Sequence, residues 1–471
     1  MQFYAHTDPS LTASFSQALL ASLAPDGGLW MPQTLPTFSP EHLARLGAKS
    51  FADCAADLAR YFVDDNISDD KLIDICRDAY DFPIPLRDFN GQILDAATPE
   101  PGDHYVLELF HGPTLAFKDM AARFMARTAA HIMTKTQQSR TLIVATSGDT
   151  GGAIGYSFLD QPGINVVILF PKNGVSKMQE QHLTTIGAAH SNVSALRVDG
   201  SFDDCQDLVK AAFVDKALNQ KLSLMSANSI NVGRVIPQSF YYLWTSLQIK
   251  AAHPGRPIIY AIPSGNLGNL TGGLMAKKMG APIDKFIIGN NANNPFVDYL
   301  KTGTYTPRAA IPTLSNAMDI GRPNNFARIL RLYEGDYHKI TQDCWGADFS
   351  DDQAARHMRH IYRKYGYAMC PHTAIGDLAM KAYLETHNMD NPVSVTVGTA
   401  HWGKFSHDVI KILREDLTLP RALSQVMDKT PHVSELANNP DSFKQYLLNM
   451  SGVSQMQEDQ AQKPPSTTRS S

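Results

Sequence analysis

Lys118 is the residue of this chain whose surroundings best suit covalent chemistry. It ends the stretch Leu109-Phe-His-Gly-Pro-Thr-Leu-Ala-Phe-Lys118, at a point where the pattern predicts that a loop becomes a helix. Apolar neighbours on both sides, among them Phe117 and Phe124, predict a partly desolvated ammonium. Desolvation lowers the pKa of a lysine, and a neutral amine can form a Schiff base with an aldehyde. Lys118 is therefore a candidate anchor for pyridoxal phosphate, although a lysine at a helix start is more often simply solvated.

The loop Thr146-Ser-Gly-Asp-Thr-Gly-Gly152 directly follows a predicted strand and opens a predicted helix. Small residues let the backbone approach a ligand, and N–H groups at a helix start suit a carboxylate or a phosphate. Ser147, Asp149 and Thr150 add hydrogen-bonding side chains. Helix capping alone would also use such residues, but four of them with three glycines exceed what capping needs. We therefore interpret this loop as a ligand-binding element.

A second loop, Ser264-Gly-Asn-Leu-Gly-Asn269, again follows a predicted strand and opens a predicted helix. Its N–H groups could form an anion nest for a phosphate, and a tight loop without a ligand is the alternative interpretation. The glycine spacing does not match the GxGxxG fingerprint of dinucleotide-binding proteins. A bound ligand at this loop would therefore present a phosphate rather than a dinucleotide.

A third loop, Gly398-Thr-Ala-His-Trp-Gly-Lys404-Phe405, matches the GxxxxGK part of a Walker A motif. Phe405 stands where that motif needs a serine or threonine to ligate magnesium. No companion acidic motif stands out at the end of another predicted strand. The sequence therefore argues against nucleotide binding at this loop.

A fourth segment, from Met225 to Arg234, runs from an apolar strand toward a helix. Asn228, Ser229 and Asn231 offer hydrogen bonds, and the planar guanidinium of Arg234 suits a phosphate or a carboxylate. The alternative interpretation is helix capping by Ser229 or Asn231, with Arg234 as a solvated residue. Both interpretations remain open at this point.

Short β-branched runs alternate with helical stretches from residue 105 to residue 405. This alternation predicts an α/β fold with parallel sheets covered by helices on both faces. The predicted strands are 142–145, 166–170, 258–262, 286–288 and 393–397. Ligands of such folds bind beyond the carboxyl ends of the strands, which is where the loops described above lie. Residues 1–95 are expected to be mixed and mostly helical, and residues 458–471 to be disordered.

Composition places the chain among soluble globular proteins of two or three domains, with 471 residues, 43% hydrophobic and 19% charged. A formal net charge of -4 gives no reason to expect nucleic acid or a membrane surface as partner. Five cysteines without a CxxC pair, no signal peptide and no long apolar run favour a cytoplasmic protein.

His357 and His360 share a predicted helix face but lack a third ligand nearby, so we interpret them as a solvent-facing pair and expect no metal.

Several short segments, in constant order from about residue 12 to about residue 410, resemble those of the threonine synthases. This family consists of pyridoxal-phosphate enzymes of fold type II, the tryptophan-synthase-β-like fold. The family's aromatic-rich opening is reduced here to Phe3-Tyr-Ala-His-Thr-Asp8, a departure at the N-terminus and not at the catalytic centre. The matching segments are Leu23-Ala-Pro-Asp-Gly-Gly-Leu29, Phe110-His-Gly-Pro-Thr-Leu-Ala-Phe-Lys-Asp119, Thr146-Ser-Gly-Asp-Thr-Gly151, Asn228-Ser-Ile-Asn231, Ser264-Gly-Asn-Leu-Gly-Asn269, Ala317-Met-Asp-Ile320, Pro371-His-Thr-Ala374 and Thr399-Ala-His401.

The resemblance implies a role for individual residues. Lys118 would carry the Schiff base and move protons, and Thr399 would face the pyridine nitrogen of the cofactor. The residues implied to hold the cofactor phosphate are Gly265, Asn266, Leu267, Gly268 and Asn269. The residues implied to bind the carboxylate and the phosphate of the substrate are Thr114, Ser147, Asp149, Thr150, Asn228, Ser229, Asn231 and Arg234.

The resemblance also implies a domain organisation. We expect an N-terminal threonine-synthase-type domain over residues 1–95 and a large cofactor-binding α/β domain over 96–130 and 235–440. A smaller α/β domain would be inserted over 131–234, and a C-terminal tail would cover 441–471.

The implied reaction converts O-phospho-L-homoserine and water to L-threonine and phosphate, the last step of threonine biosynthesis. The expected partner is this small substrate, and the chain is expected to act as a monomer or homodimer. Two alternatives stay open. The chain could be a dehydratase or β-replacement enzyme of the same fold acting on serine- or threonine-like substrates, or a non-catalytic or nucleotide-binding protein that keeps the architecture.

Overall fold

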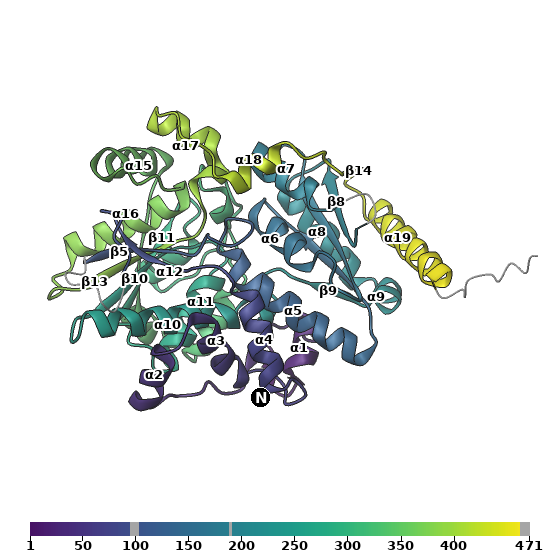
Figure 1. Ribbon diagram of the computed structural model, residues 1–471, viewed down its shortest axis with the longest axis horizontal. Coiled ribbons are helices and arrows are strands. Elements are labelled where there is room, and N and C mark those ends of the chain that lie inside the picture. The colour runs from purple at the N-terminus through teal and green to yellow at the C-terminus, as the bar shows by residue number, and fades with distance from the viewer. Residues whose placement is uncertain (95–102, 188–190, 462–471) are drawn as a thin grey trace, which may run out of the picture.

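Two sheets, each inside its own lobe, organise the computed structural model, which describes residues 1–94, 103–187 and 191–461 (Figure 1). The six-stranded sheet of the large lobe has the order β12-β11-β10-β13-β5-β4, and only β4 runs antiparallel to its neighbour. Its strands are β4 (Leu86–Asp88), β5 (His104–Glu108), β10 (Ile258–Pro263), β11 (Lys285–Asn290), β12 (Cys344–Asp348) and β13 (Val393–Gly398). The predicted strands at 258–262, 286–288 and 393–397 are therefore confirmed.

Strand β10 buries both of its faces, which explains why its sequence is an uninterrupted apolar run. On one face, the ring of Tyr260 contacts Tyr242 of α10 (Ile236–Ala252), with centroids 5.2 Å apart, beside α11 (Gly268–Lys278). On the other face, Ala261 packs with Met380 of α16 (Pro371–Thr386). The other helices of this lobe are α12 (Pro295–Thr302), α13 (Phe326–Leu332), α14 (Tyr337–Asp343), α15 (Asp351–Tyr365) and α17 (Ser406–Leu413).

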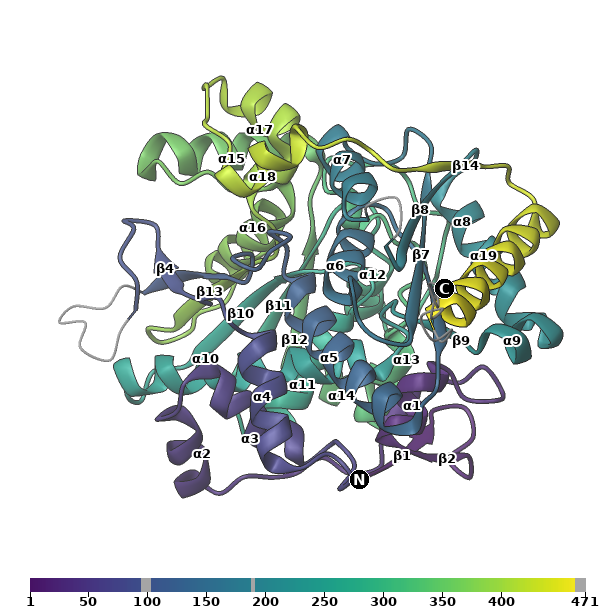
Figure 2. The same cartoon turned by 45° about the vertical axis from the view of Figure 1, so that its right-hand side comes forward.

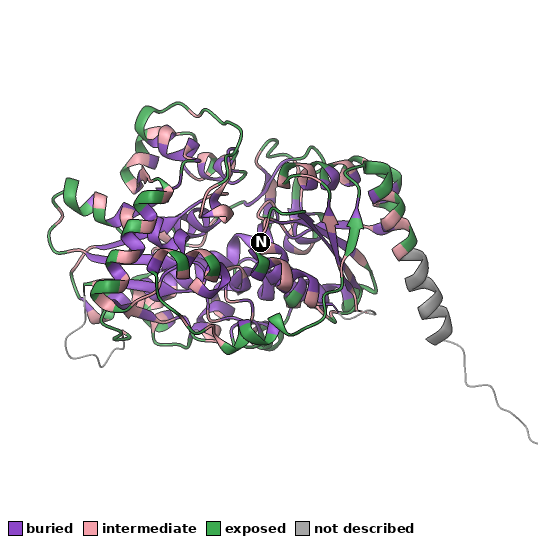
Figure 3. Ribbon diagram, turned by 90° about the horizontal axis from the view of Figure 1, so that it is seen from above, coloured by how far each residue is buried: buried purple, intermediate pink, exposed green. Residues whose placement is uncertain are grey.

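The small lobe contains a five-stranded, fully parallel sheet of order β14-β8-β7-β6-β9. Its strands are β6 (Arg140–Ala145), β7 (Ile164–Pro171), β8 (Val193–Val198), β9 (Leu224–Ser226) and β14 (Ser434–Leu436). Its helices are α6 (Asp149–Phe158), α7 (Lys177–Thr185), α8 (Phe202–Val214) and α9 (Lys216–Leu222), joined by α18 (Arg421–Met427) and α19 (Pro440–Ala461) from the end of the chain. Figure 3 shows that most strands of both lobes are buried and that exposed residues lie mainly on the outer helices and loops, and β14 is exposed at two of its three residues.

The end of the chain departs from the expected organisation, which assigned residues 235–440 to the large domain. Strand β14 pairs with β8 at the edge of the small sheet, and α19 lies beside α8 and α9 (Figure 2). Leu436, Phe443 and Leu447 are buried in the apolar cluster of the small lobe. The physical reason is that an exposed sheet edge and an apolar helix surface both gain a partner. Residues 458–471 were expected to be disordered, but residues 458–461 belong to α19, which corrects that part of the prediction; residues 462–471 lie outside the described part of the chain.

The N-terminal segment contains, besides its helices, a small antiparallel sheet that the sequence pattern did not predict. Its order is β2-β1-β3, with strands β1 (Gln2–Ala5), β2 (Thr12–Ser14) and β3 (Trp30–Pro32). The helices are α1 (Phe15–Ala21), α2 (Pro40–Gly47), α3 (Phe51–Arg60) and α4 (Asp69–Ala79). Each begins after a serine whose hydroxyl accepts a backbone N–H of the first turn, the favoured way to satisfy a helix start: Ser14, Ser39, Ser50 and Ser68.

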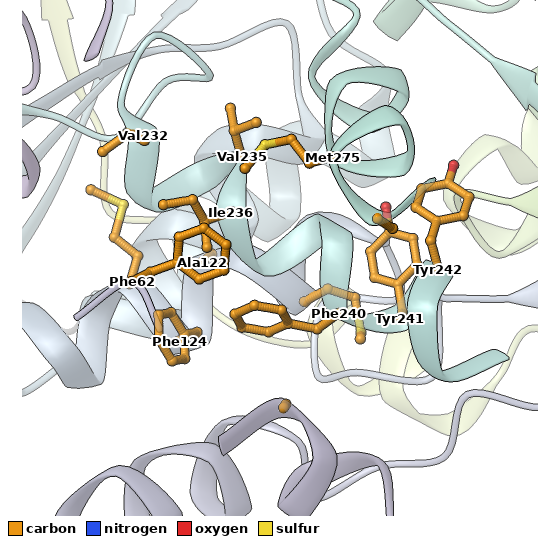
Figure 4. Close-up of a cluster of buried hydrophobic side chains, with 14 of the residues drawn as sticks. Phe62, Ala122, Phe124, Val232, Val235, Ile236, Phe240, Tyr241, Tyr242 and Met275 are labelled. Atoms are coloured by element: carbon orange, nitrogen blue, oxygen red, sulfur yellow. The ribbon is translucent and has the colours of Figure 1, made fainter. Parts of the chain in front are cut away.

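A cluster of buried aromatic side chains holds the helix that begins at Lys118, α5 (Lys118–Thr136) (Figure 4). Phe124 of α5 meets Phe240 of α10 edge-on, with ring centroids 5.8 Å apart. Phe62 from the N-terminal segment contacts the same ring at 6.5 Å. Burying one such side chain contributes roughly 1.5–3 kcal/mol. The packing therefore fixes α5 between the N-terminal segment and the large lobe.

Across the described ranges, no helix combines the length and the apolar character that crossing a membrane requires.

Candidate active site

A pocket between the two sheets collects the carboxyl ends of strands from both lobes. Ala145 ends β6 and Asn228 follows β9 on the side of the small lobe. Pro263 ends β10 and Thr399 follows β13 on the side of the large lobe. This is the position at which parallel α/β sheets bind ligands.

Lys118 lies in the wall of this pocket at the first turn of α5, as its sequence context predicted. The preceding loop is tied to the end of β13. Phe117 donates its N–H to the carbonyl of Thr399 (2.8 Å), and His401 donates its N–H to the carbonyl of Leu115 (3.0 Å). These backbone bonds hold Lys118 and Thr399 on adjacent segments, although 281 positions of the numbering separate them.

The ammonium of Lys118 carries no hydrogen bond or ion pair to a described residue, and only lies over the ring of Phe117 at 4.3 Å. Burial, and then the nearby charge of Arg234, lower the pKa of Lys118 from 10.5 to about 8, while Asp149 opposes this shift. At pH 7 about a tenth of this side chain is therefore the neutral amine, far more than for a solvated lysine. The lowered pKa agrees with the desolvation that the sequence context of Lys118 predicted, and attachment of an aldehyde at this amine stays a prediction.

The loop 264–269 forms a cradle at the start of α11. Leu267 adopts a left-handed conformation (φ 60°), which turns the chain from β10 into the helix. A Cβ on Gly265 would lie only 3.0 Å from the Cα of Met318, so this position accepts no larger residue without displacing the facing loop. The first N–H groups of a helix have no partner within it, and here none of them donates to another residue that the structure describes, which leaves them available to an anion.

The side-chain amide of Asn269 has a fixed orientation in this cradle. Its Oδ1 accepts hydrogen bonds from the hydroxyls of Tyr241 (2.6 Å) and Tyr242 (2.7 Å), so Nδ2 turns away from them. Nδ2 is buried and, within the described residues, has no partner, and the same holds for Oγ of Ser264. Two orphaned polar atoms beside free helix N–H groups are the arrangement expected where a phosphate belongs.

Lys404, the lysine of the apparent Walker motif, lies in the short helix η3 (Trp402–Phe405) and is 1% exposed. Its Nζ donates to the carbonyl of Thr114 (2.8 Å) and forms an ion pair with Asp149 (3.0 Å). Burial alone would raise the pKa of Asp149, but Lys404, followed by His372, outweighs it and lowers that pKa. The lysine therefore neutralises a buried carboxylate between the two lobes.

Residues of the segment 225–234 have two different roles: some hold the local structure together, and others line the pocket. Asn231 is fully buried and donates to the carbonyls of Leu19 (2.8 Å) and Ser226 (2.9 Å), while its Oδ1 accepts the N–H of Gly233 (2.9 Å). Arg234 is 4% exposed and lines the pocket, where its Nε has no partner within the described residues. The capping interpretation therefore holds for Asn231, and the solvated interpretation of Arg234 is wrong.

The structure brings together most of the residues that the sequence pointed to. Thr114 and Asn231 are the two that do not line the pocket. Thr114 directs its hydroxyl and its N–H to the carboxylate of Asp119 (2.7 and 2.8 Å), so its side chain is already committed. The pocket-lining residues from the predicted set are Lys118, Ser147, Asp149, Thr150, Asn228, Ser229, Arg234, Gly265, Asn266, Leu267, Gly268, Asn269 and Thr399.

Sequence reasoning missed several residues of the pocket wall, among them Gln238, Ile320 and His372. Ile320 and His372 lie in Ala317-Met-Asp-Ile320 and Pro371-His-Thr-Ala374. Both segments contributed to the family resemblance, which marked them without giving any of their residues a role. Gln238 follows the predicted segment 225–234 by one helical turn, and no motif singles it out.

The prediction that the two histidines on α15 form a solvent-facing pair is wrong. His357 is 8% exposed and forms a hydrogen bond with Asp377 of α16 (2.6 Å), whereas His360 is exposed. The pair therefore does not face solvent together, because α16 covers the side of α15 that carries His357. Over the described residues, no group of three or more His, Cys, Asp or Glu side chains is arranged to hold a metal ion.

Comparison with protein families gives three matches that together cover most of the chain. A family described as "Pyridoxal-phosphate dependent enzyme" matches residues 94–398. "Threonine synthase N terminus" matches residues 3–80, and "Threonine synthase, C-terminal" matches residues 373–447.

Individual relatives agree with these matches. The threonine synthase of Escherichia coli is 36% identical over 430 residues, which is 91% of this chain and 95% of the relative. A crystal structure of threonine synthase from Escherichia coli superimposes with a TM-score of 0.85, covering 96% of this chain and all of the other. A structure described as PLP-bound threonine synthase from Brucella melitensis is 32% identical, with a TM-score of 0.86 and coverage of 96% and 99%.

Proposed function

The chain belongs to the threonine synthase family of pyridoxal-phosphate-dependent enzymes, and we propose that it converts O-phospho-L-homoserine and water to L-threonine and phosphate. The cofactor is pyridoxal 5'-phosphate. We propose further that it acts in the cytoplasm as a monomer or homodimer.

The pocket fits this cofactor. Lys118 offers a partly neutral amine with no competing partner in the described structure, which suits attachment to an aldehyde. The 264–269 cradle offers Nδ2 of Asn269, Oγ of Ser264 and helix N–H groups to a phosphate. Thr399, 6% exposed, supports a neutral contact to the ring nitrogen.

When bound, pyridoxal phosphate supplies an electron sink that stabilises negative charge at Cα of the substrate. The residues of this chain then hold the substrate and move its protons. Nζ of Lys118 takes the Cα proton and returns it at the end, which one relocating amine can do because its pKa lies near the working pH. Asn228, Ser229 and Arg234 line the pocket, where they would hold the departing phosphate.

One observation supports a phosphorylated substrate: the pocket contains positive charge, at Arg234, that lies outside the 264–269 cradle for the cofactor phosphate. Asp149 is neutralised by Lys404, so it does not balance the remaining cations. Burial lowers the pKa of Arg234 only to about 10, so its guanidinium stays charged at neutral pH. An anionic group of the substrate next to Arg234 would satisfy this charge.

The decisive experiment supplies the purified holoenzyme with phosphohomoserine or with threonine. Release of inorganic phosphate together with formation of threonine supports the proposal. Ketoacid from threonine, without phosphate release from phosphohomoserine, would instead identify a dehydratase of the same fold.

Asn269→Asp is expected to weaken pyridoxal phosphate binding about 100-fold. The substitution keeps the size of the side chain and both acceptor bonds from Tyr241 and Tyr242, but it replaces a donor by a negative charge facing the phosphate. Titration of the apoprotein with the cofactor measures the change. Asn449→Asp adds the same charge on an exposed face of α19 and serves as the control. Equal affinity of the Asn269 variant and the wild type would contradict the phosphate assignment.

Attachment of pyridoxal phosphate to the apoprotein is expected to accelerate with pH up to about 8 and then level off. Only the neutral amine of Lys118 reacts, so the rate falls about tenfold for each pH unit below the pKa. The pKa of Lys118 is lower in the folded protein than in the unfolded chain. Between pH 8 and 10.5 the unfolded chain therefore binds more protons at this lysine than the folded protein does. Because of this difference, the free energy of unfolding of the apoprotein rises with pH across that window. Stopped-flow absorbance after mixing gives the rate, and a midpoint near 10.5 would show that Lys118 is not desolvated.

A further inference from the structure

His372 is a buried pocket residue to which the proposed chemistry assigns no task. It occupies the first turn of α16 and is 3% exposed. Its ring packs against Phe405, with centroids 4.8 Å apart, and it belongs to the pocket wall. The ring therefore has a fixed place in the large lobe, at the border of the pocket.

One backbone hydrogen bond decides which nitrogen of His372 carries the proton. The N–H of Ala317 donates to Nε2 at 3.2 Å. An N–H can only donate, so Nε2 is the unprotonated acceptor and the neutral ring must carry its proton on Nδ1. The tautomer follows from the partner and not from a choice of hydrogen placement.

Nδ1 is therefore a donor without an acceptor. It is buried, and no described residue accepts a hydrogen bond from it. Burial is the largest cause that lowers the pKa of His372; Asp149 of the small lobe opposes it, Lys118 adds to it, and the resulting pKa is about 4. The imidazole stays neutral at physiological pH, and its buried Nδ1–H at the pocket wall can donate to an atom bound in the pocket.

We propose that His372 is a substrate-binding residue whose Nδ1–H donates a hydrogen bond to an anionic oxygen of the substrate, either its carboxylate or its phosphate. This inference rests on the proposed function. It assigns the histidine to binding and not to proton transfer, because Nε2 is occupied by Ala317 and Nδ1 already holds its proton. It also connects the pocket to the Ala317–Ile320 loop, since one ring contacts both.

Two substitutions of His372 test the roles of its two ring nitrogens separately. The amide of Asn branches at Cγ, as imidazole does, so its NH2 can replace the Nδ1 donor. The amide of Gln lies one bond farther, so its oxygen can replace Nε2 as acceptor for Ala317 while the donor is lost. His360→Gln, on the exposed side of α15, is the matched control and should leave the kinetics unchanged.

We expect His372→Gln to lower kcat/KM for phosphohomoserine by about 10- to 100-fold, mostly through KM, with the pH profile unchanged in shape. His372→Asn should keep kcat/KM at least about tenfold above His372→Gln. Equal losses in both variants, or loss of one limb of the pH profile, would overturn the proposal. So would a loss of cofactor affinity in His372→Gln as large as the loss in kcat/KM.

Product inhibition identifies the oxygen. Weaker inhibition of His372→Gln by inorganic phosphate points to the substrate phosphate, and weaker inhibition by L-threonine points to the carboxylate. Unchanged inhibition by both would overturn the proposal, even if His372→Asn did not fold. A wild-type enzyme without phosphate release would instead refute the proposed function, so the two failures are distinguishable.

Discussion

Lys118→Ala is expected to lower kcat/KM for phosphohomoserine by at least about 10³-fold and to remove the visible absorbance of the bound cofactor. The reason is that one nitrogen performs two tasks: Nζ attaches the cofactor and then moves the substrate protons. No other lysine among the described residues lines the pocket, so no other amine of the wall can replace it. Spectra of the reconstituted protein and steady-state phosphate release measure the two losses.

Lys135→Ala is the matched control, because Lys135 lies in the last turn of the same helix and is exposed. It should keep both the absorbance and the activity. A Lys118→Ala protein that remains coloured and active would mean that another amine attaches the cofactor. In that case the 264–269 cradle would lie near Lys118, while the amine that attaches the cofactor would be another one.

Lys404→Met is expected to destabilise the holoenzyme by about 3–5 kcal/mol. Lys404 and Asp149 are 1% and 6% exposed and 3.0 Å apart, so the variant leaves a buried carboxylate without its counter-charge. The carbonyl of Thr114 also loses its donor. Urea unfolding, followed by circular dichroism at constant cofactor concentration, measures the change in the unfolding free energy.

Two further variants separate charge from volume. Lys210→Met removes an ion pair with Asp207 whose side chains are 69% and 72% exposed, and it should cost less than about 1 kcal/mol. Lys404→Met combined with Asp149→Asn removes both charges and should be less destabilised than Lys404→Met alone. If the single and the double variant are equally unstable, the lost contacts of the lysine stem, and not the unpaired carboxylate, explain the effect.

The N-terminal segment and the small lobe show how far local patterns reach. Serine caps and apolar periodicity act over three or four residues, so the helices and the buried strands can be predicted from the sequence. Strand β14 has three residues, of which only Leu436 is buried, and carries no local signal of its own. Its position is decided by the open edge of β8, which is more than two hundred residues away in the sequence.

In the candidate site, too, some residues could be predicted from local patterns and others could not. Lys118, the 146–152 loop and the 264–269 loop combine a distinctive residue type with a position after a strand, and each lines the pocket. Thr114 and Asn231 have suitable side chains beside pocket residues, but their hydrogen bonds are used elsewhere. A sequence states what a side chain can bind, whereas its direction is set by packing.

The sequence by itself determined the chemistry available to this protein: a lysine in apolar surroundings, two loops suited to anions and an arginine in a polar segment. These are local properties, because desolvation by neighbours and helix-start N–H groups depend on adjacent residues. Only the tertiary structure decided the partners: Thr399 next to Lys118, Lys404 as counter-charge of Asp149, and Nδ1 of His372 left without an acceptor. Such relations join residues from separate strands and lobes, and they arise only when the chain folds around one pocket.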